Sequence, residues 1–222
     1  MGRTQSLNNL TDQQKGSLLA FVAVMFITPD SLFIRLSNID TWGLVFYRGI
    51  IPFLTVFLAM LLIYKSNFFK IFINSGIHGL IYVITFSITN ITFVVSIQNT
   101  NVANTLVMIA TAPMLSAVLS AIFLKEPTDK KTLISIIITF ISVIYIFSDS
   151  FKLGNVYGDV LGFVTAIGLA IGAVTIRSAK SKNLVPAAVV GKLFVAAFAL
   201  FFIESFVLED RDLIIVPLMC IL

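Results

Sequence analysis

The residues best suited to chemistry in this chain are polar groups inside long apolar stretches. Asp30, Arg48, Asn90 and Asn104 lie in the first four such stretches, each two to seven residues from one end. If the stretches are membrane-crossing helices, these side chains lie about 3 to 10 Å below one surface. A charge there costs about 2.5–3.5 kcal/mol and needs a partner. Two interpretations remain open: a shared polar cavity, or an Asp30–Arg48 structural pair with amide hydrogen bonds between helices.

Catalytic and metal-binding side chains are scarce. Cys220 is the only cysteine and His78 the only histidine, which excludes a disulfide framework and multi-Cys or His-pair metal motifs. An intramembrane enzyme would need a nucleophile with a base, a metal pair or paired aspartates. The sequence also has no Walker A motif for an ATP-driven pump. We therefore expect no enzyme activity, no cofactor and no metal.

The composition indicates the surroundings of these groups. Of 222 residues, 58% are hydrophobic and only 12% are charged, about half of the usual share of roughly 25%. The mean hydropathy is +1.02, which excludes a soluble globular protein, a disordered chain and a collagen-like fibre. The apolar stretches are continuous and long, which favours helices over a β-barrel. The sequence predicts an all-α integral membrane protein, a polytopic helix bundle.

Seven complete spans and the start of an eighth account for most of the chain. A span needs about 20 apolar residues. The fifth has 15 and must borrow polar residues at its ends, and the eighth has ten. We expect the eighth to continue beyond residue 222 in the native gene. The predicted spans are residues 16–36, 42–64, 76–97, 102–124, 133–147, 158–176, 185–208 and 213–222.

Lysine and arginine determine the predicted orientation. With a cytoplasmic N-terminus, ten of the 15 basic residues lie in cytoplasmic segments and three lie outside, in line with the positive-inside rule. We therefore predict a multi-pass protein of the inner membrane, with residues 1–15 as a cytoplasmic N-terminus. The net charge of +4 reflects these segments and indicates no nucleic-acid partner. The expected partners are the lipid bilayer and a small-molecule substrate.

A weak internal repeat relates the two halves of the chain. At an offset of 142 residues, six of twenty positions agree between the first and sixth spans, including Gly16 with Gly158. A slip of two residues places Lys192 on Arg48. The alternatives are chance similarity between apolar helices and a Lys192 side chain that extends to the membrane interface. A five-span unit inverts its second copy, as in many secondary transporters. The predicted halves are residues 16–148 and an incomplete 158–222.

The sixth span contains two G-x-x-x-G steps, which allow close helix contact. Packing inside the bundle is the favoured interpretation, and a homodimer is the other. The glycines are Gly158, Gly162, Gly168 and Gly172.

The fourth span carries the most specific motif. Residues 99–106 open it, residues 111–117 contain Pro113, and residues 123–128 close it with an aromatic-Leu-x-Glu pattern. This resembles the EamA-type permeases of the drug/metabolite transporter superfamily, most specifically over residues 112–128. The second span, with Arg48 in residues 45–48, also resembles theirs. The resemblance implies ten spans in two inverted halves, cytoplasmic termini, and export of small metabolites, often amino acids or drugs. The chain departs from the family by ending within the eighth span.

The repeat, the resemblance and the polar layer together predict a secondary transporter. It would move small polar metabolites or amino-acid-like compounds across the inner membrane by alternating access. Asp30, Arg48, Asn90 and Asn104 are the predicted substrate-binding residues of an outward-facing vestibule, with Lys192 as the inner counterpart of Arg48. The alternative is a channel-like or structural membrane subunit without carrier activity.

Overall fold

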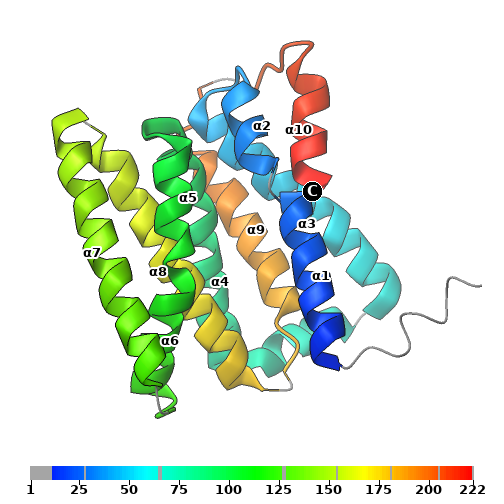
Figure 1. The fold of residues 1–222 in the computed structure, drawn as a ribbon. Helices are drawn as coiled ribbons and strands as arrows, with labels where there is room; N and C mark the ends of the chain where they lie inside the picture. The colour runs from blue at the N-terminus through cyan, green and yellow to red at the C-terminus, as the bar shows by residue number, and fades with distance from the viewer. Residues whose placement is uncertain are drawn as a thin grey trace, which may run out of the picture.

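Helices form all of the regular secondary structure in the part of the chain that the structure describes. The computed structural model describes residues 12–27, 29–64, 67–126, 129–153, 155–180, 182–204 and 206–221. Figure 1 shows the helices in chain order. They are α1 (Asp12–Ile27), α2 (Asp30–Leu36), α3 (Thr41–Tyr64), α4 (Asn67–Asn99), α5 (Val102–Ala110), α6 (Ala112–Phe123), α7 (Lys130–Leu153), α8 (Val156–Ala179), α9 (Val185–Ala199) and α10 (Asp212–Ile221).

Several helices have the length and composition of membrane spans. By these criteria the stretches Thr41–Tyr64, Phe68–Asn99, Val102–Phe123 and Val156–Ala179 are able to cross a membrane, and Val185–Ala199 is a shorter apolar helix. A helix of 24 residues extends about 36 Å, more than the roughly 30 Å hydrocarbon core. Many large apolar side chains lie exposed on the surface of the bundle, where lipid would cover them. The predicted all-α membrane bundle is confirmed.

Two predicted spans are interrupted helices. The first ends as α1 at Ile27 and resumes as α2 at Asp30. The fourth is divided at Thr111, because Pro113 at the start of α6 has no N–H with which to continue the α5 hydrogen bonds. The Thr111 N–H and hydroxyl both donate to the Met108 carbonyl, at 3.0 and 2.6 Å, and so close α5. Both interruptions leave backbone groups free of the regular helical pattern.

One predicted boundary is wrong, and another coincides with a break in a helix. The seventh span was expected to reach residue 208, but α9 ends at Ala199 and a turn follows. In this turn Phe202 stacks on Trp42 of α3, with 4.7 Å between the ring centroids. The apolar residues after Ala199 therefore pack against α3 in a turn and do not continue the helix. The third span was expected to begin at residue 76. Although α4 begins at Asn67, its helical backbone is interrupted at residue 76, so the helix that follows begins where the sequence predicted. Gly76, with φ 58° and ψ −140°, bends this helix at the expected start.

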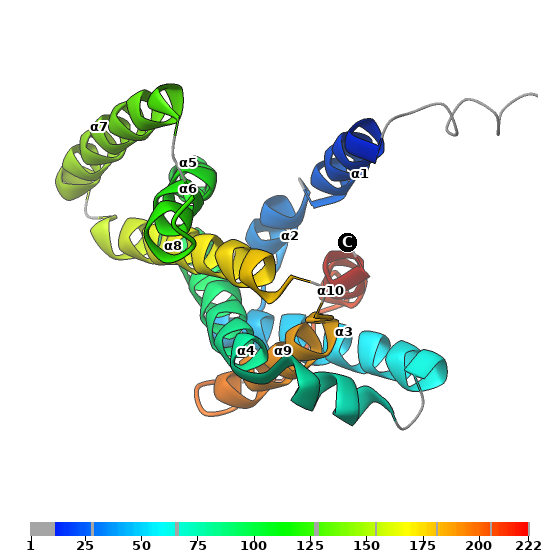
Figure 2. The same cartoon turned by 90° about the horizontal axis from the view of Figure 1, so that it is seen from below.

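The helix α4 is the one on which much of the bundle packs. It contacts α8 from Tyr82 to Asn99 and also contacts α9, α3, α2 and α5. Figure 2 shows α9 beside both α3 and α4, with α7 at one edge of the molecule. The helix α10 packs on α3 and α2. Of the helices long enough to cross a membrane, α4 and α8 are therefore the most enclosed by protein.

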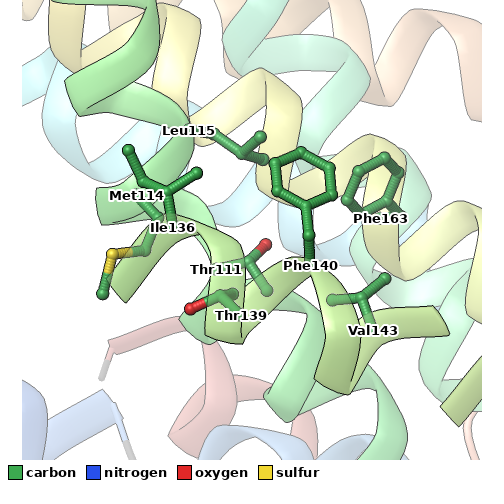
Figure 3. Close-up of a pocket in the computed structure, with 8 residues that line it drawn as sticks. All are labelled: Thr111, Met114, Leu115, Ile136, Thr139, Phe140, Val143 and Phe163. Carbon is green, nitrogen blue, oxygen red and sulfur yellow. The ribbon is translucent and has the colours of Figure 1, made fainter. Parts of the chain in front are cut away.

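The helix α7 docks on the outer side of α6 and α8. Side chains from the Thr111 break, from α7 and from α8 converge around a small hollow, where the rings of Phe140 and Phe163 lie next to each other (Figure 3). The hollow encloses only about 10 Å³. It is a packing contact that holds α7 in place and is too small for a metabolite.

The glycines of α8 explain its close approach to α4. A Cβ atom at Gly158 would lie 2.6 Å from the carbonyl carbon of Asn99, and one at Gly168 would lie 2.2 Å from the Thr89 hydroxyl. At the same interface the Thr92 and Thr165 hydroxyls lie 2.7 Å apart in a hydrogen bond. The G-x-x-x-G steps thus serve packing within the chain, which is the favoured interpretation of the sequence. The homodimer stays a prediction.

Candidate substrate cavity

A cavity of about 550 Å³ lies between α4 and α8, with further lining from α2, α3 and α5. Its polar lining includes the three predicted site residues Asp30, Arg48 and Asn90. Its apolar wall includes Tyr82 and Phe93 from α4 and several aliphatic residues of α8. The volume falls within the usual range for small-molecule sites, roughly 300–1,000 Å³, and the mostly apolar wall with a few polar groups is typical of them.

Asp30 and Arg48 form an ion pair at one side of the cavity. Nη1 of Arg48 donates to Oδ1 of Asp30, and the two side chains are only 14% and 10% exposed. Asp30 is the first residue of α2, where free backbone N–H groups favour a negative charge. The Phe93 ring lies 5.6 Å from the guanidinium carbon of Arg48. The pair expected from the sequence therefore exists and also lines a cavity, so both interpretations of these two residues hold together.

Asn90 links the cavity to Lys192. Its Nδ2 donates to the Phe86 carbonyl at 2.8 Å, and its Oδ1 accepts from Nζ of Lys192 at 2.7 Å. The Phe86 ring lies 5.5 Å from the same Nζ. Lys192 is not among the residues that line the cavity. Its ammonium group lies behind Asn90 and Phe86.

The sequence predicted that Lys192 is an inner counterpart of Arg48, on a separate level of the membrane. The structure does not place it on a separate level. The helices α3 and α9 cross closely at Gly49, where a Cβ atom would lie 2.7 Å from the Ala196 backbone nitrogen and 2.9 Å from the Lys192 carbonyl. This crossing places Arg48, which directly precedes Gly49, and Lys192 at the same level of the bundle. Arg48 and Lys192 are consequently within electrostatic range of each other and of Asp30.

Asn104 does not lie at the cavity. Its Nδ2 donates to Oδ2 of Asp159 at 3.3 Å, and the Thr100 hydroxyl donates to the other carboxylate oxygen. Asp159, in the first turn of α8, is fully buried. The prediction for Asn104 rested on depth alone, and depth does not distinguish the cavity from this second cluster. Sequence reasoning missed Asp159, although an acid directly after Gly158 in the close-packed span was a usable signal.

The charges around the cavity do not balance. Two cations, Arg48 and Lys192, lie near one acid, Asp30, and that acid is already paired with Arg48. Within the described residues no group of three His, Cys, Asp or Glu side chains is placed to hold a metal ion. The arrangement is thus an apolar cavity with hydrogen-bond donors and an excess positive charge at one side.

An all-helical membrane bundle with a partly polar cavity that opens at the surface of the bundle has the architecture of a small-molecule transporter. In a comparison with models of protein families, residues 14–148 match the EamA-like transporter family. The match covers more than half of the chain, so the protein belongs to this family and is a membrane permease of the drug/metabolite transporter superfamily. The resemblance noted in the sequence is confirmed. No curated protein and no solved structure matches the chain in the corresponding comparisons.

Proposed function

We propose that the protein is a secondary transporter that moves small polar metabolites or amino-acid-like compounds across the inner membrane by alternating access. The observation that carries the proposal is the cavity of about 550 Å³ with Asp30, Arg48 and Asn90 on its wall. Ionisable groups inside membrane spans are costly and mark substrate pathways in many transporters. The proposed substrate-binding residues are these three, with Lys192 acting through Asn90.

The helix contacts support an inverted repeat with halves 16–148 and 158–222. The offset of 142 residues relates α1 and α2 to α8, α3 to α9, and α4 to α10. Exchanging the halves converts the contact α4–α8 into α10–α2, and α4–α9 into α10–α3; all four contacts occur. The contact α3–α9 converts into itself. Such a pattern is expected when a two-fold axis passes near the crossing of α3 and α9, where Arg48 and Lys192 lie.

Transport in proteoliposomes tests the carrier proposal. A carrier saturates with substrate and accelerates labelled uptake when unlabelled substrate is loaded on the opposite side, because one site alternates between the two faces. Substrates come from profiling the metabolites that accumulate outside cells expressing the full-length protein. Flux that rises linearly with concentration and shows no counterflow would favour the alternative, a channel-like or structural subunit.

The ion pair provides the test of the site. We expect the double variant Asp30→Asn with Arg48→Gln to reach the membrane at normal levels and to lose transport, since the charges are removed together and neither is stranded. The matched control is Glu126→Gln with Arg177→Gln, which removes an exposed ion pair of 3.0 Å outside the cavity. Normal transport by the Asp30–Arg48 double variant would mean that the pair only joins two helices.

A further inference from the structure

The excess cation beside the cavity, Lys192, is unusual for a partly buried position in a membrane bundle. Lys192 forms no ion pair within the part of the chain that the structure describes, and its partners are the neutral Asn90 amide and the Phe86 ring. Arg48 has its one nearby acid, Asp30, already bound through Nη1. A buried charge without a counter-charge is costly. An anion in the cavity would supply the missing counter-charge.

The donors on the cavity wall are also not used up. Arg48 has five N–H groups, and its Nε is buried without a hydrogen-bond partner in the described residues. Asn90 has two N–H groups on Nδ2, and the Phe86 carbonyl accepts from this atom. Its Oδ1 already accepts from Lys192, and one N–H group on Nδ2 remains to donate. The polar side of the cavity therefore presents hydrogen-bond donors near a positive charge.

The remainder of the cavity wall is apolar and partly aromatic. Tyr82 and Phe93 lie on the α4 side, and Leu169 and Ile176 lie on the α8 side. Such a wall fits a ring-sized hydrocarbon body, which gains about 25 cal/mol for each Å² of apolar surface buried. The cavity thus joins an anion-attracting end to an apolar body.

We propose that the cavity selects small organic anions with an apolar, ring-bearing body, and that it prefers them to zwitterions, neutral analogues and cations of the same shape. This inference rests on the proposed transport function and narrows its substrate class. The anionic group lies against Arg48 and Asn90, and Lys192 sets the positive potential from behind Asn90. Among the described residues that line the cavity, the acid that an ammonium group would meet is Asp30, and it is bound to Arg48.

Four probes with one hydrocarbon body test the preference on the wild-type protein in lipid nanodiscs, by titration calorimetry. They are 3-phenylpropionate, phenylalanine, 3-phenylpropanol and 3-phenylpropylamine. We expect the carboxylate to bind about tenfold more tightly than the alcohol, as for a hydrogen bond to a charged group, and the amine to bind most weakly. Tightest binding of phenylalanine or the amine overturns the anion preference and leaves the transport proposal intact. No binding of any probe overturns the cavity as a binding site and the preference with it.

Lys192→Met removes the excess charge and keeps an unbranched side chain that is one atom shorter. We expect it to weaken 3-phenylpropionate binding about tenfold and to change alcohol binding much less, so that the ratio of the two affinities falls to about one. Lys182→Met is the matched control, because Lys182 lies away from the cavity and only reaches the Ser75 carbonyl, at 3.5 Å. Lys192→Arg, which keeps the charge, should retain the preference. An unchanged ratio of carboxylate to alcohol affinity in Lys192→Met overturns the proposal, and if that variant does not fold, the four-probe comparison decides alone.

Discussion

Asp159 is the most enclosed acid in the described part of the chain, and its oxygens are satisfied by side chains of a neighbouring segment. The Thr100 hydroxyl and the Asn104 amide donate to its carboxylate, while Arg35 donates to the Thr100 carbonyl. These contacts join the start of α8 to the turn between α4 and α5. A carboxylate that accepts several hydrogen bonds can be buried at a tolerable cost.

Replacing this acid should destabilise the protein. In Asp159→Ala the Thr100 hydroxyl and the Asn104 amide lose their acceptor, and we expect the free energy of unfolding to fall by about 3 kcal/mol. Denaturation in mixed micelles measures it. The control is Asp210→Ala, at an exposed position in the loop before α10, which should change stability by less than about 0.5 kcal/mol. Equal stability of the two variants would contradict a structural role for Asp159.

At the residue scale, the sequence identified the ion pair but not all of its surroundings. Asp30 and Arg48 were predictable because charges inside apolar stretches need partners, and each was the other's simplest partner. Asn104 was misplaced because depth along a helix does not give the direction of a side chain. Asp159 was overlooked because it lies near a helix end, where acids are usually solvated. Lys192 was assigned a separate layer because the repeat gives equivalence and not proximity.

The α4–α8 contact shows how small residues determine the position of an element. Gly158, Gly162 and Gly168 face α4, and none of them has room for a Cβ atom without displacement of a neighbour. The hydrogen bond from the Ser96 hydroxyl to the Gly158 carbonyl, 2.7 Å, depends on this approach. Since α4 and α8 also form the two main walls of the cavity, the glycines affect its width.

A methyl group in this contact should force the helices apart. In Gly158→Ala the Cβ meets the Asn99 backbone, which cannot move as a flexible side chain would. We expect a loss of about 1–3 kcal/mol of stability, the usual cost of overpacking, and a lower melting temperature in detergent by fluorescence-detected size exclusion. Gly16→Ala, in α1, is the control, since nothing lies within 4 Å of its Cβ position. A melting temperature equal to that of Gly16→Ala would show that α4 yields at no cost.

At the element scale, hydropathy predicted which segments are helices but not where they are interrupted. The division at Thr111 follows from Pro113, a local cause that a sequence displays. The early end of α9 has a tertiary cause, the packing of Phe198 and Phe202 on Trp42. The mean hydropathy of an apolar segment is the same whether its side chains face lipid or a neighbouring aromatic ring. The sequence therefore predicted the start of α9 at Val185 but could not give its end at Ala199.

At the scale of the whole molecule, the ends of α7 give the clearest test of orientation. This helix of 24 residues separates the loop at Asp129 from the loop at Asn155, at opposite ends of the bundle (Figure 1). With a cytoplasmic N-terminus, a reporter active only outside the cytoplasm should work at Asn155 and fail at Asp129. The reason is the excess of basic residues in the segments on the Asp129 side. Activity at Asp129 alone would reverse the topology.

The pair of Asp30 and Arg48 bears on how the chain is made as well as on what it binds. The two residues are 18 positions apart, so both have left the ribosome once the first helical hairpin is complete. An acid and a base that enter the translocon together as a bonded pair avoid most of the cost of about 2.5–3.5 kcal/mol that each would meet alone. Lys192 emerges more than a hundred residues later, when the Asn90 that receives it is already in the bilayer. The order of synthesis thus delivers a neutral pair first and the excess cation last, into a polar setting that is already assembled.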